Sequence, residues 1–393
     1  MSPDASEGRG LWRIGAGTTL VVLAFSVVNP VLAVTLQRRG VNAGAIGLFA
    51  MLPFLTVATM IPVMPRVFAR IGVIRAYRVG LVLGVLSLAG YALTDSYLAW
   101  CCWSVLGALG AAAEWNGTEA LIAFNAPPAR RGRFTGLYQT ALGAALAVGP
   151  LLPGALQWLL PVGQPLHTVW LLWGAAAIYA LALAVTAGPA VGRLRASHSG
   201  AGHDSLRAAL RARPALVWIA FAGGVFEAGL GGITAAYGSQ LGMSLGVATS
   251  IAGALGVGSF ALQYPAGWLA DHAPVRRVFG VAGALLLLSV LAFGLAPRAA
   301  ALFWVAAFLW GAVGGALYTL TMVRVAHEFT GRSTIAGTAA MITGYTAGGA
   351  VGPAVSGLML ERCGVPGQSL WLAALAVSVI AVALRMHAAS DER

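Results

Sequence analysis

Long apolar runs alternate with short polar breaks along the whole chain. A helix that crosses the hydrocarbon core of a bilayer needs about 20 apolar residues. Twelve runs approach this length, and each ends at a charged residue or at a break marked by proline or glycine. They cover residues 11–36, 43–64, 77–94, 97–123, 134–160, 166–187, 215–241, 245–270, 278–296, 299–326, 333–360 and 369–384. The pattern predicts an all-α integral membrane protein with about twelve transmembrane helices.

The composition agrees with a lipid environment. The 393 residues are 59% hydrophobic and only 9% charged, whereas soluble domains carry about 25% charged residues. A soluble fold must wet its own exterior and cannot hide that much apolar surface. The chain also has 52 glycines, and small residues let helices pack closely in lipid. We therefore interpret the glycines as packing residues and not as a phosphate-binding loop.

The positive charge of the chain sets its expected orientation. The formal net charge is +12, and all 24 basic residues are arginines. They lie between the apolar runs, so no nucleic acid is expected as a partner. With twelve spans both termini share one side, and 20 of the 24 arginines fall on that side. Because arginine accumulates in cytoplasmic loops, we expect a multi-pass protein of the cell membrane with both termini in the cytoplasm.

The two halves of the chain repeat each other. Three short matches share a separation of 203 positions, and they are Gly149-Pro150 with Gly352-Pro353, Pro62 with Pro265, and Gln37 with Gln240. Each half has an even number of spans, so the repeats are parallel. We expect an N-terminal six-helix bundle over 1–192, a cytoplasmic basic linker over 193–213 and a C-terminal six-helix bundle over 214–393. The arginines of the linker either bind anionic membrane lipids or only fix the topology.

A polar motif follows the eighth apolar run. It reads Gly267-Trp268-Leu269-Ala270-Asp271 and is followed by Arg276-Arg277. This segment resembles a loop motif of the major facilitator superfamily, whose fold is two parallel six-helix repeats. The resemblance implies that Asp271 and the arginines form a cytoplasmic charge cluster that gates the exchange between two states. The alternative is that Asp271 only caps a helix. In the first half Met64 and Phe68 replace the glycine and the aspartate, so any such latch is one-sided.

A second motif pairs glycine with proline in spans five and eleven. Gly149-Pro150 and Gly352-Pro353 are similar to the glycine–proline motif of exporters in this superfamily. Proline frees a backbone carbonyl and kinks a helix, while glycine permits close packing. The motif favours efflux, although kinked packing helices also occur in importers.

Within the superfamily the chain most resembles the YcaD-type transporters. The segments that carry this resemblance are Asn29-Pro30, Trp115 with Glu119-Ala120-Leu121, Gln263-Tyr264-Pro265, Leu317-Tyr318 and Glu328. The resemblance transfers no defined substrate.

Three carboxyl groups lie well inside the predicted spans. Of the twelve acidic residues, only Glu114, Glu119 and Glu227 are placed in this way. An ionised acid at the centre of a lipid-facing helix costs about 2.5–3.5 kcal/mol or more. Each must therefore face a bundle interior or a water-filled cavity, or stay protonated. All three are candidates for proton coupling or substrate binding, and the alternative for each is a neutral structural carboxyl group.

The positions of the first two acids on their helix exclude a paired site. Glu114 and Glu119 lie five residues apart, which corresponds to about 140° around an ideal helix. Further candidates for the substrate site are Asn29, Tyr318 and Trp115. Asn29 is expected to break span one beside Pro30, and it either binds substrate or satisfies the carbonyl that the proline frees. The two aromatic residues either line a cavity or only pack.

These features together predict a secondary active transporter. We expect an amphiphilic or lipophilic small molecule to be moved by alternating access, with efflux coupled to protons. Uptake by proton symport is the alternative, and a membrane sensor is a more distant one. No Walker-type phosphate loop occurs, and no HExxH or GxSxG motif indicates an enzyme. No cofactor and no metal site are expected; the expected partners are the substrate, protons and membrane lipids.

Overall fold

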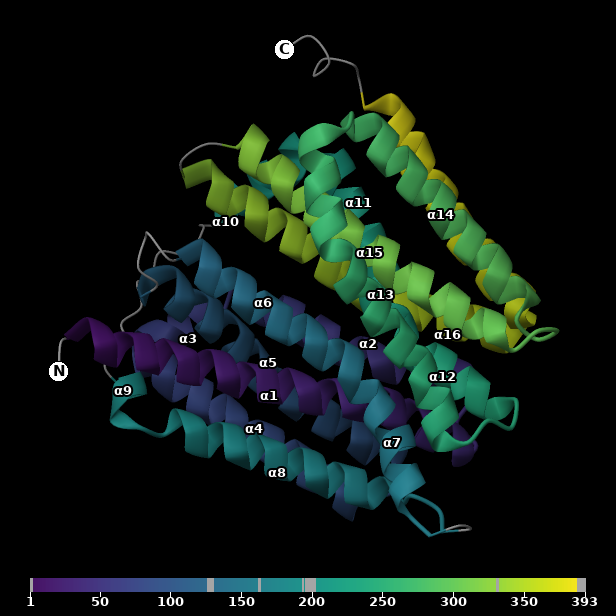
Figure 1. Cartoon of the computed structure of the whole chain (residues 1–393), viewed down its shortest axis with the longest axis horizontal. Helices are drawn as coiled ribbons and strands as arrows, with labels where there is room; N and C mark the ends of the chain where they lie inside the picture. Colours follow the sequence, from purple (N-terminus) through teal and green to yellow (C-terminus); the bar gives the residue numbers. More distant parts are fainter. Residues whose placement is uncertain are drawn as a thin grey trace. The chain divides into compact units, whose positions relative to one another are not determined.

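The computed structural model of the chain is built from helices (Figure 1). It describes residues 3–125, 131–161, 164–192, 194, 203–329 and 332–386, and none of these residues forms a strand. Eleven of the described helices are long and apolar enough to cross a membrane. The last of these spans covers 50 residues, Ala336–Arg385, and it is divided by a kink at Gly364, where φ is 63°. This division gives the twelve predicted spans and confirms the fold class.

The helices follow the chain in the order of the predicted spans. The first set is α1 (Pro3–Arg38), α2 (Ala43–Met60), α3 (Met64–Ile71), α4 (Val73–Leu93), α5 (Tyr97–Asn125), α6 (Arg131–Val148), η2 (Gly149–Leu151), α7 (Leu152–Leu159) and α8 (Thr168–Thr186). Two short helices follow, α9 (Pro189–Gly192) and α10 (His203–Ala212). The second set is α11 (Pro214–Gly224), η3 (Val225–Gly229), α12 (Leu230–Gln240), α13 (Leu245–His272), α14 (Val275–Leu295), α15 (Ala301–Glu328) and α16 (Arg332–Arg385).

The chain forms two compact units. Unit 1 comprises Met1–Leu32 and Leu52–Gly200, and unit 2 comprises Ala33–Met51 and Ala201–Arg393. The end of α1 and the beginning of α2 therefore pack with the helices of unit 2. Within unit 1, α4 lies against both α5 and α8 (Figure 1). Within unit 2, α15 packs along α13, and α16 packs along α11 and α14.

Close helix packing in both units depends on glycine. In unit 1 the backbones of α4 and α5 meet at Gly80 and Gly110, where a Cβ on Gly80 would lie 2.7 Å from the Gly110 carbonyl oxygen. In unit 2 a Cβ on Gly223 of α11 would lie 2.8 Å from the Gly314 carbonyl oxygen of α15. Helices in lipid gain van der Waals contact when small residues let their backbones approach, which is the role that the glycine content predicted.

Prolines disturb the spans unequally. The prediction that Asn29 and Pro30 break span one is wrong, because α1 continues through Pro30 as one helix. Span two does break after Met60, where two prolines within four residues (Pro62 and Pro65) each remove a backbone donor. Pro65 then lies in the first turn of α3, where proline costs no hydrogen bond.

The matching glycine–proline pairs also affect spans five and eleven unequally. Span five changes from α6 to a 3₁₀ turn at Gly149–Leu151 before it continues as α7. Span eleven carries the matching Gly352-Pro353 pair, yet its non-helical backbone lies only at Gly364. The loop predicted between spans eleven and twelve is therefore replaced by a sharp kink within α16.

Candidate functional site

Glu227 lies in the one irregular turn of span seven. The chain passes from α11 to α12 through a π-helical segment, Val225–Gly229, with Glu227 at its centre. A π-turn inserts one residue into a helix and occurs frequently at functional sites. The side chain of Glu227 is half-buried within unit 2. The irregular turn thus places a carboxyl group inside the second helical unit while leaving it partly accessible.

Both oxygens of the Glu227 carboxyl group accept hydrogen bonds. The Ser259 hydroxyl of α13 donates to Oε1 in a short contact. The Tyr345 hydroxyl of α16 donates to Oε2 at 2.9 Å. Behind Ser259, the Gln263 side-chain amide donates to the Ser259 oxygen at 3.5 Å. Three helices of unit 2 therefore converge on one acidic group.

Glycine on α15 makes room for this arrangement. A Cβ on Gly315 would lie 2.9 Å from both Glu227 Oε1 and Ser259 Oγ. A Cβ on Gly314 would lie 2.9 Å from the Glu227 backbone nitrogen. Such distances are too short for a real side chain. The carboxyl group can therefore occupy its place only because α15 has glycine at both positions.

The predicted kink motif of span eleven packs directly on the π-turn. A Cβ on Gly352 would lie 3.1 Å from the Val225 Cα atom, and the Pro353 Cδ atom would lie 2.8 Å from a Cβ on Gly229. Gly352 and Pro353 thus contact both ends of the segment that carries Glu227. In unit 1 the matching Gly149 faces Ser26 of α1, whose hydroxyl donates to the Ala145 carbonyl oxygen at 2.9 Å.

Two tyrosines stand beside the carboxyl group. The ring centroids of Tyr318 on α15 and Tyr345 on α16 are 4.7 Å apart, and the rings are tilted by 49°. Both side chains are half-buried. The sequence singled out Glu227 and Tyr318, and the fold brings these two predicted residues into one cluster. Ser259 and Tyr345 were missed, because a lone serine or tyrosine in an apolar run carries no signal of its own.

Glu114 occupies a different environment in unit 1. Its side chain is 2% exposed, and neither carboxyl oxygen has a hydrogen-bond partner among the described residues. It lies against α4, where a Cβ on Gly80 would approach Glu114 Oε1 to 3.3 Å. This residue therefore faces into its own bundle and is not part of an open site in unit 1.

A buried hydroxyl cluster lies one turn from Glu114. The Thr118 hydroxyl donates to the Glu114 backbone carbonyl oxygen at 2.8 Å and lies 2.7 Å from the Thr18 hydroxyl oxygen. Thr18 in turn lies 3.0 Å from the Tyr77 hydroxyl oxygen. These contacts join α1, α4 and α5 inside unit 1.

Glu119 lies on another face of α5, as the helical spacing predicts. Its side chain is exposed, and so is that of Trp115, one turn earlier on the same helix. Asn29 is half-buried on α1 in the same unit. Glu119 and Trp115 are therefore neighbours, whereas Glu114 is separate from both.

The gating motif lies at the junction of α13 and α14. Gly267 is on the last turns of α13, and Arg276 and Arg277 are exposed in the first turn of α14. Asp271 belongs to the last turn of α13, but its side chain lies outside the described part of the structure. The predicted contacts of Asp271 therefore stay a prediction.

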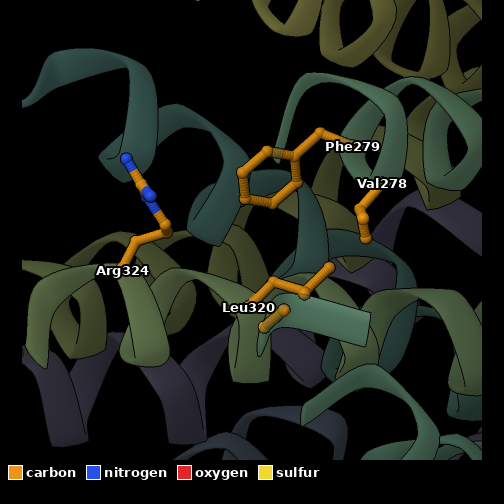
Figure 2. Close-up of a pocket in the computed structure, with 5 residues that line it drawn as sticks. Val278, Phe279, Leu320 and Arg324 are labelled. Carbon is orange, nitrogen blue, oxygen red and sulfur yellow. The ribbon is translucent and has the colours of Figure 1, made fainter. Parts of the chain in front are cut away.

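A charge cluster stands close to this junction in unit 2. Glu328 accepts from Arg324, one turn earlier on α15, at 2.6 Å and from Arg213 at 2.5 Å. Arg324 also borders a small apolar hollow between α13, α14 and α15 (Figure 2). Val278, Phe279 and Leu320 surround this hollow, and the Arg324 guanidinium is its charged edge. Glu328 thus ties the start of α11 to the end of α15.

The matches to known proteins extend over most of the chain. The family model described as Major Facilitator Superfamily matches residues 14–257 and again residues 218–391. A transporter described as uncharacterised and MFS-type from Yersinia enterocolitica is 23% identical over 366 residues, which is 88% of this chain and 87% of that protein. The MFS-type transporter YcaD of Shigella flexneri is 24% identical over 359 residues and 88% of each chain. The resemblance found in the sequence is confirmed.

Solved transporter structures share the fold. A bacterial homologue of the human lysosomal transporter Spinster superposes with a TM-score of 0.69 at 15% identity, covering 96% of this chain and 95% of that chain. The nucleoside transporter NupG superposes with a TM-score of 0.72 at 13% identity, covering 95% of this chain and 97% of that chain. These similarities show the fold alone. They do not identify the residues that line a site in this chain.

Proposed function

The chain belongs to the major facilitator superfamily of membrane transporters, and from this premise we propose that it exports an amphiphilic or lipophilic small molecule in exchange for protons. The proposal includes alternating access as the mechanism and the cell membrane as the location. The observation that carries it is the Glu227 carboxyl group, which the π-turn holds between Ser259 and Tyr345.

This arrangement suits a group that gains and loses a proton. A hydroxyl group can donate to a carboxylate and can accept from a carboxylic acid. Ser259 and Tyr345 therefore satisfy Glu227 in both protonation states without a change of partners. An ionised acid inside a membrane is costly, so a site of this kind favours uptake of a proton once the bound molecule leaves. The outward direction rests on the similarity of Gly149-Pro150 and Gly352-Pro353 to the exporter motif.

Transport measured in proteoliposomes with an imposed pH gradient tests the coupling. We expect the wild-type protein to drive lipophilic compounds against the proton gradient. Glu227→Gln keeps the shape and hydrogen bonding of the side chain but cannot release a proton. Its gradient-driven transport is therefore expected to fall to the leak rate of protein-free vesicles, while the protein still inserts and elutes as a monodisperse peak.

The same assay tests the other predicted acid and the direction. Glu119→Gln is expected to weaken coupling, since Glu119 is the exposed one of the two acids, Glu114 and Glu119, that lie well inside a span of unit 1. A Glu119→Gln/Glu227→Gln protein that transports at the wild-type rate would remove both residues from the mechanism. Accumulation of substrate on the side toward which protons flow would contradict exchange and establish uptake by proton symport.

A further inference from the structure

Helix α3 is a separate short helix between the second and third spans. The second span ends at Met60 and the third begins at Val73. Gly72, the residue after α3, has a φ of 83°, a left-handed conformation that favours glycine. Its amide donates to the Phe68 carbonyl oxygen at 2.9 Å and closes the helix. α3 therefore lies where the chain leaves and re-enters the membrane, at the level of the bilayer surface.

One face of α3 is an apolar anchor. Met64 and Phe68 lie one turn apart and are 5% and 7% exposed. The Phe68 ring reaches α5, where a Cβ on Gly117 would lie 3.9 Å from its Cζ atom. Met64 and Phe68 are the two residues that replace the glycine and the aspartate of the superfamily loop motif. The replacement removes the acid of that motif and fixes α3 to unit 1 by apolar packing instead.

The opposite face of α3 is basic. Arg66 and Arg70 are exposed and four residues apart, which places them on the same side of the helix. Arg75, in the first turn of α4, is exposed as well. Arg78, three residues further on, is instead half-buried and donates to the Thr186 carbonyl oxygen of α8 at 2.7 Å. Three of these four arginines therefore present their charge to the surroundings of unit 1.

No acid lies close to these three arginines in the sequence. The chain has no aspartate or glutamate between Glu7 and Asp95. Within the described part of the structure, the ion pairs join Arg213 and Arg324 to Glu328 in unit 2, and none engages the arginines of α3. Exposed guanidinium groups are stable in water, but several of them close together create a positive potential that attracts anions.

An anionic phospholipid fits this surface better than a soluble anion does. Ile71, next to Arg70, is 41% exposed, so an apolar side chain accompanies the charges. Apolar and basic residues on a helix at the membrane surface are typical of an interfacial helix. Basic clusters beside a transmembrane helix attract anionic head groups, and guanidinium groups bind phosphate through paired hydrogen bonds. A soluble anion would use the charges alone and leave Ile71 in water.

We infer that Arg66, Arg70 and Arg75 bind the phosphate head group of an anionic phospholipid, whose acyl chains contact Ile71. The lipid holds the basic face of α3 at the bilayer surface. This lipid site occupies the segment that replaces the gating motif in the first half of the chain. It is independent of the transported substrate and of the direction of transport.

Hydrogen exchange of the full chain in lipid nanodiscs gives a local test. Exchange of the peptide covering 62–72 is compared between discs of phosphatidylcholine alone and discs that also contain phosphatidylglycerol. We expect phosphatidylglycerol to slow this exchange by about fivefold, which corresponds to about 1 kcal/mol, because the bound head group opposes local opening of α3. In Arg66→Gln/Arg70→Gln the two kinds of disc are expected to give equal exchange.

Lipid binding to the full chain in a neutral detergent gives a second test. Native mass spectrometry compares dioleoylphosphatidylglycerol with dioleoylphosphatidylcholine, which have the same acyl chains and differ in net charge. We expect the wild-type protein to prefer phosphatidylglycerol. Arg66→Gln/Arg70→Gln is expected to weaken the tightest phosphatidylglycerol binding by about tenfold, which corresponds to about 1.4 kcal/mol, and to leave phosphatidylcholine binding unchanged.

Two double variants serve as controls. Arg66→Lys/Arg70→Lys keeps both charges, and we expect it to keep the lipid preference and the slowed exchange of α3. Arg298→Gln/Arg362→Gln removes the same charge from exposed positions of unit 2, and its α3 peptide is expected to respond to phosphatidylglycerol like the wild type. Thermal unfolding of each variant in detergent checks that the fold is retained.

Three outcomes would overturn the lipid site. The first is equal exchange of the α3 peptide in both kinds of disc for the wild-type protein. The second is a preference for phosphatidylglycerol that Arg66→Gln/Arg70→Gln leaves intact. The third is slowing of the exchange by glycerol phosphate in solution as strongly as by phosphatidylglycerol, which would identify a site for free phosphate. None of these measurements uses transport, so their failure leaves the proposed function untouched.

Discussion

Glu114 and Glu227 lie inside spans of different units and have opposite surroundings. Glu227 has hydroxyl donors on two helices, whereas Glu114 is buried with no partner for either oxygen among the described residues. A polar group buried without a hydrogen bond costs about 1–3 kcal/mol. The first arrangement can hold a charge, and the second favours a neutral acid.

Replacement of Glu114 by an apolar residue of similar shape tests this difference. Glu114→Met removes the unpartnered oxygens and keeps an unbranched side chain against Gly80. We expect it to stabilise the protein by about 1–3 kcal/mol, because that burial cost is relieved. The measurement is thermal unfolding in detergent, seen as a higher melting temperature.

Glu114→Gln is the matched control for this prediction. Glutamine has the same size and leaves polar atoms in the same place, so its melting temperature is expected to stay close to that of the wild-type protein. A lower melting temperature for Glu114→Met would reveal a hydrogen-bonded or ligand-bound carboxyl group. Proton-coupled transport by the Met variant would show that Glu114 does not carry the coupling.

At the scale of elements, helix α2 begins with one local and one distant cap. The Asn42 side chain accepts from the Ala45 amide at 2.8 Å, a standard cap that is readable from the sequence. The Gly44 amide instead donates to Glu361 on α16 at 2.8 Å, a residue 317 positions away. A Cβ on Gly44 would collide with this carboxylate, so glycine is needed there. The contact lies within unit 2 and holds Ala33–Met51 to α16.

Hydrogen exchange at the start of α2 measures the distant cap. Glu361→Ala removes the acceptor of the Gly44 amide, and we expect exchange in the peptide covering 40–48 to rise by about tenfold, as expected for a hydrogen bond worth about 1.4 kcal/mol. Arg362→Ala, at the exposed neighbouring position, is the control and is expected to exchange like the wild type. Identical exchange in both variants would mean that Glu361 does not hold this helix end.

At the scale of the whole molecule, the placement of arginines predicts the orientation. A single cysteine at Ser197, introduced into a protein without native cysteines, is expected to react with a membrane-impermeant maleimide only from the cytoplasmic side. A cysteine at His167 is expected to react only from outside. The physical reason is the retention of arginine-rich loops on the cytoplasmic side. Reversed labelling at both positions would show that the topology is inverted and that the gating motif lies on the outer side.

The gating motif concerns exchange between whole-molecule states. Asp271 lies in the last turn of α13, and the exposed Arg276 and Arg277 lie in the first turn of α14, so loss of the charge is expected to change the balance between states. We expect Asp271→Asn to bind ligand with wild-type affinity but to transport several times more slowly. Turnover at the wild-type rate with an altered ligand preference would assign Asp271 to selectivity instead.

The amino-acid sequence by itself determined the membrane class, the number of spans and the family. These properties follow from apolar runs whose length matches the bilayer, because lipid offers a spanning backbone no partner outside its own helix. Local spacing also places Arg324 and Glu328 one turn apart on one helix, where they form an ion pair. Each of these features depends on residues that are close together in the chain.

Only the tertiary structure decided which buried acid has partners. Ser259 and Tyr345 lie 32 and 118 positions from Glu227, and no local pattern distinguishes them from other polar residues in apolar spans. The same holds for the opposite environments of Glu114 and Glu227, and for the continuity of α16 through Pro353. Hydrophobicity assigns a residue to the membrane interior, but the partners of its side chain depend on how separate helices pack.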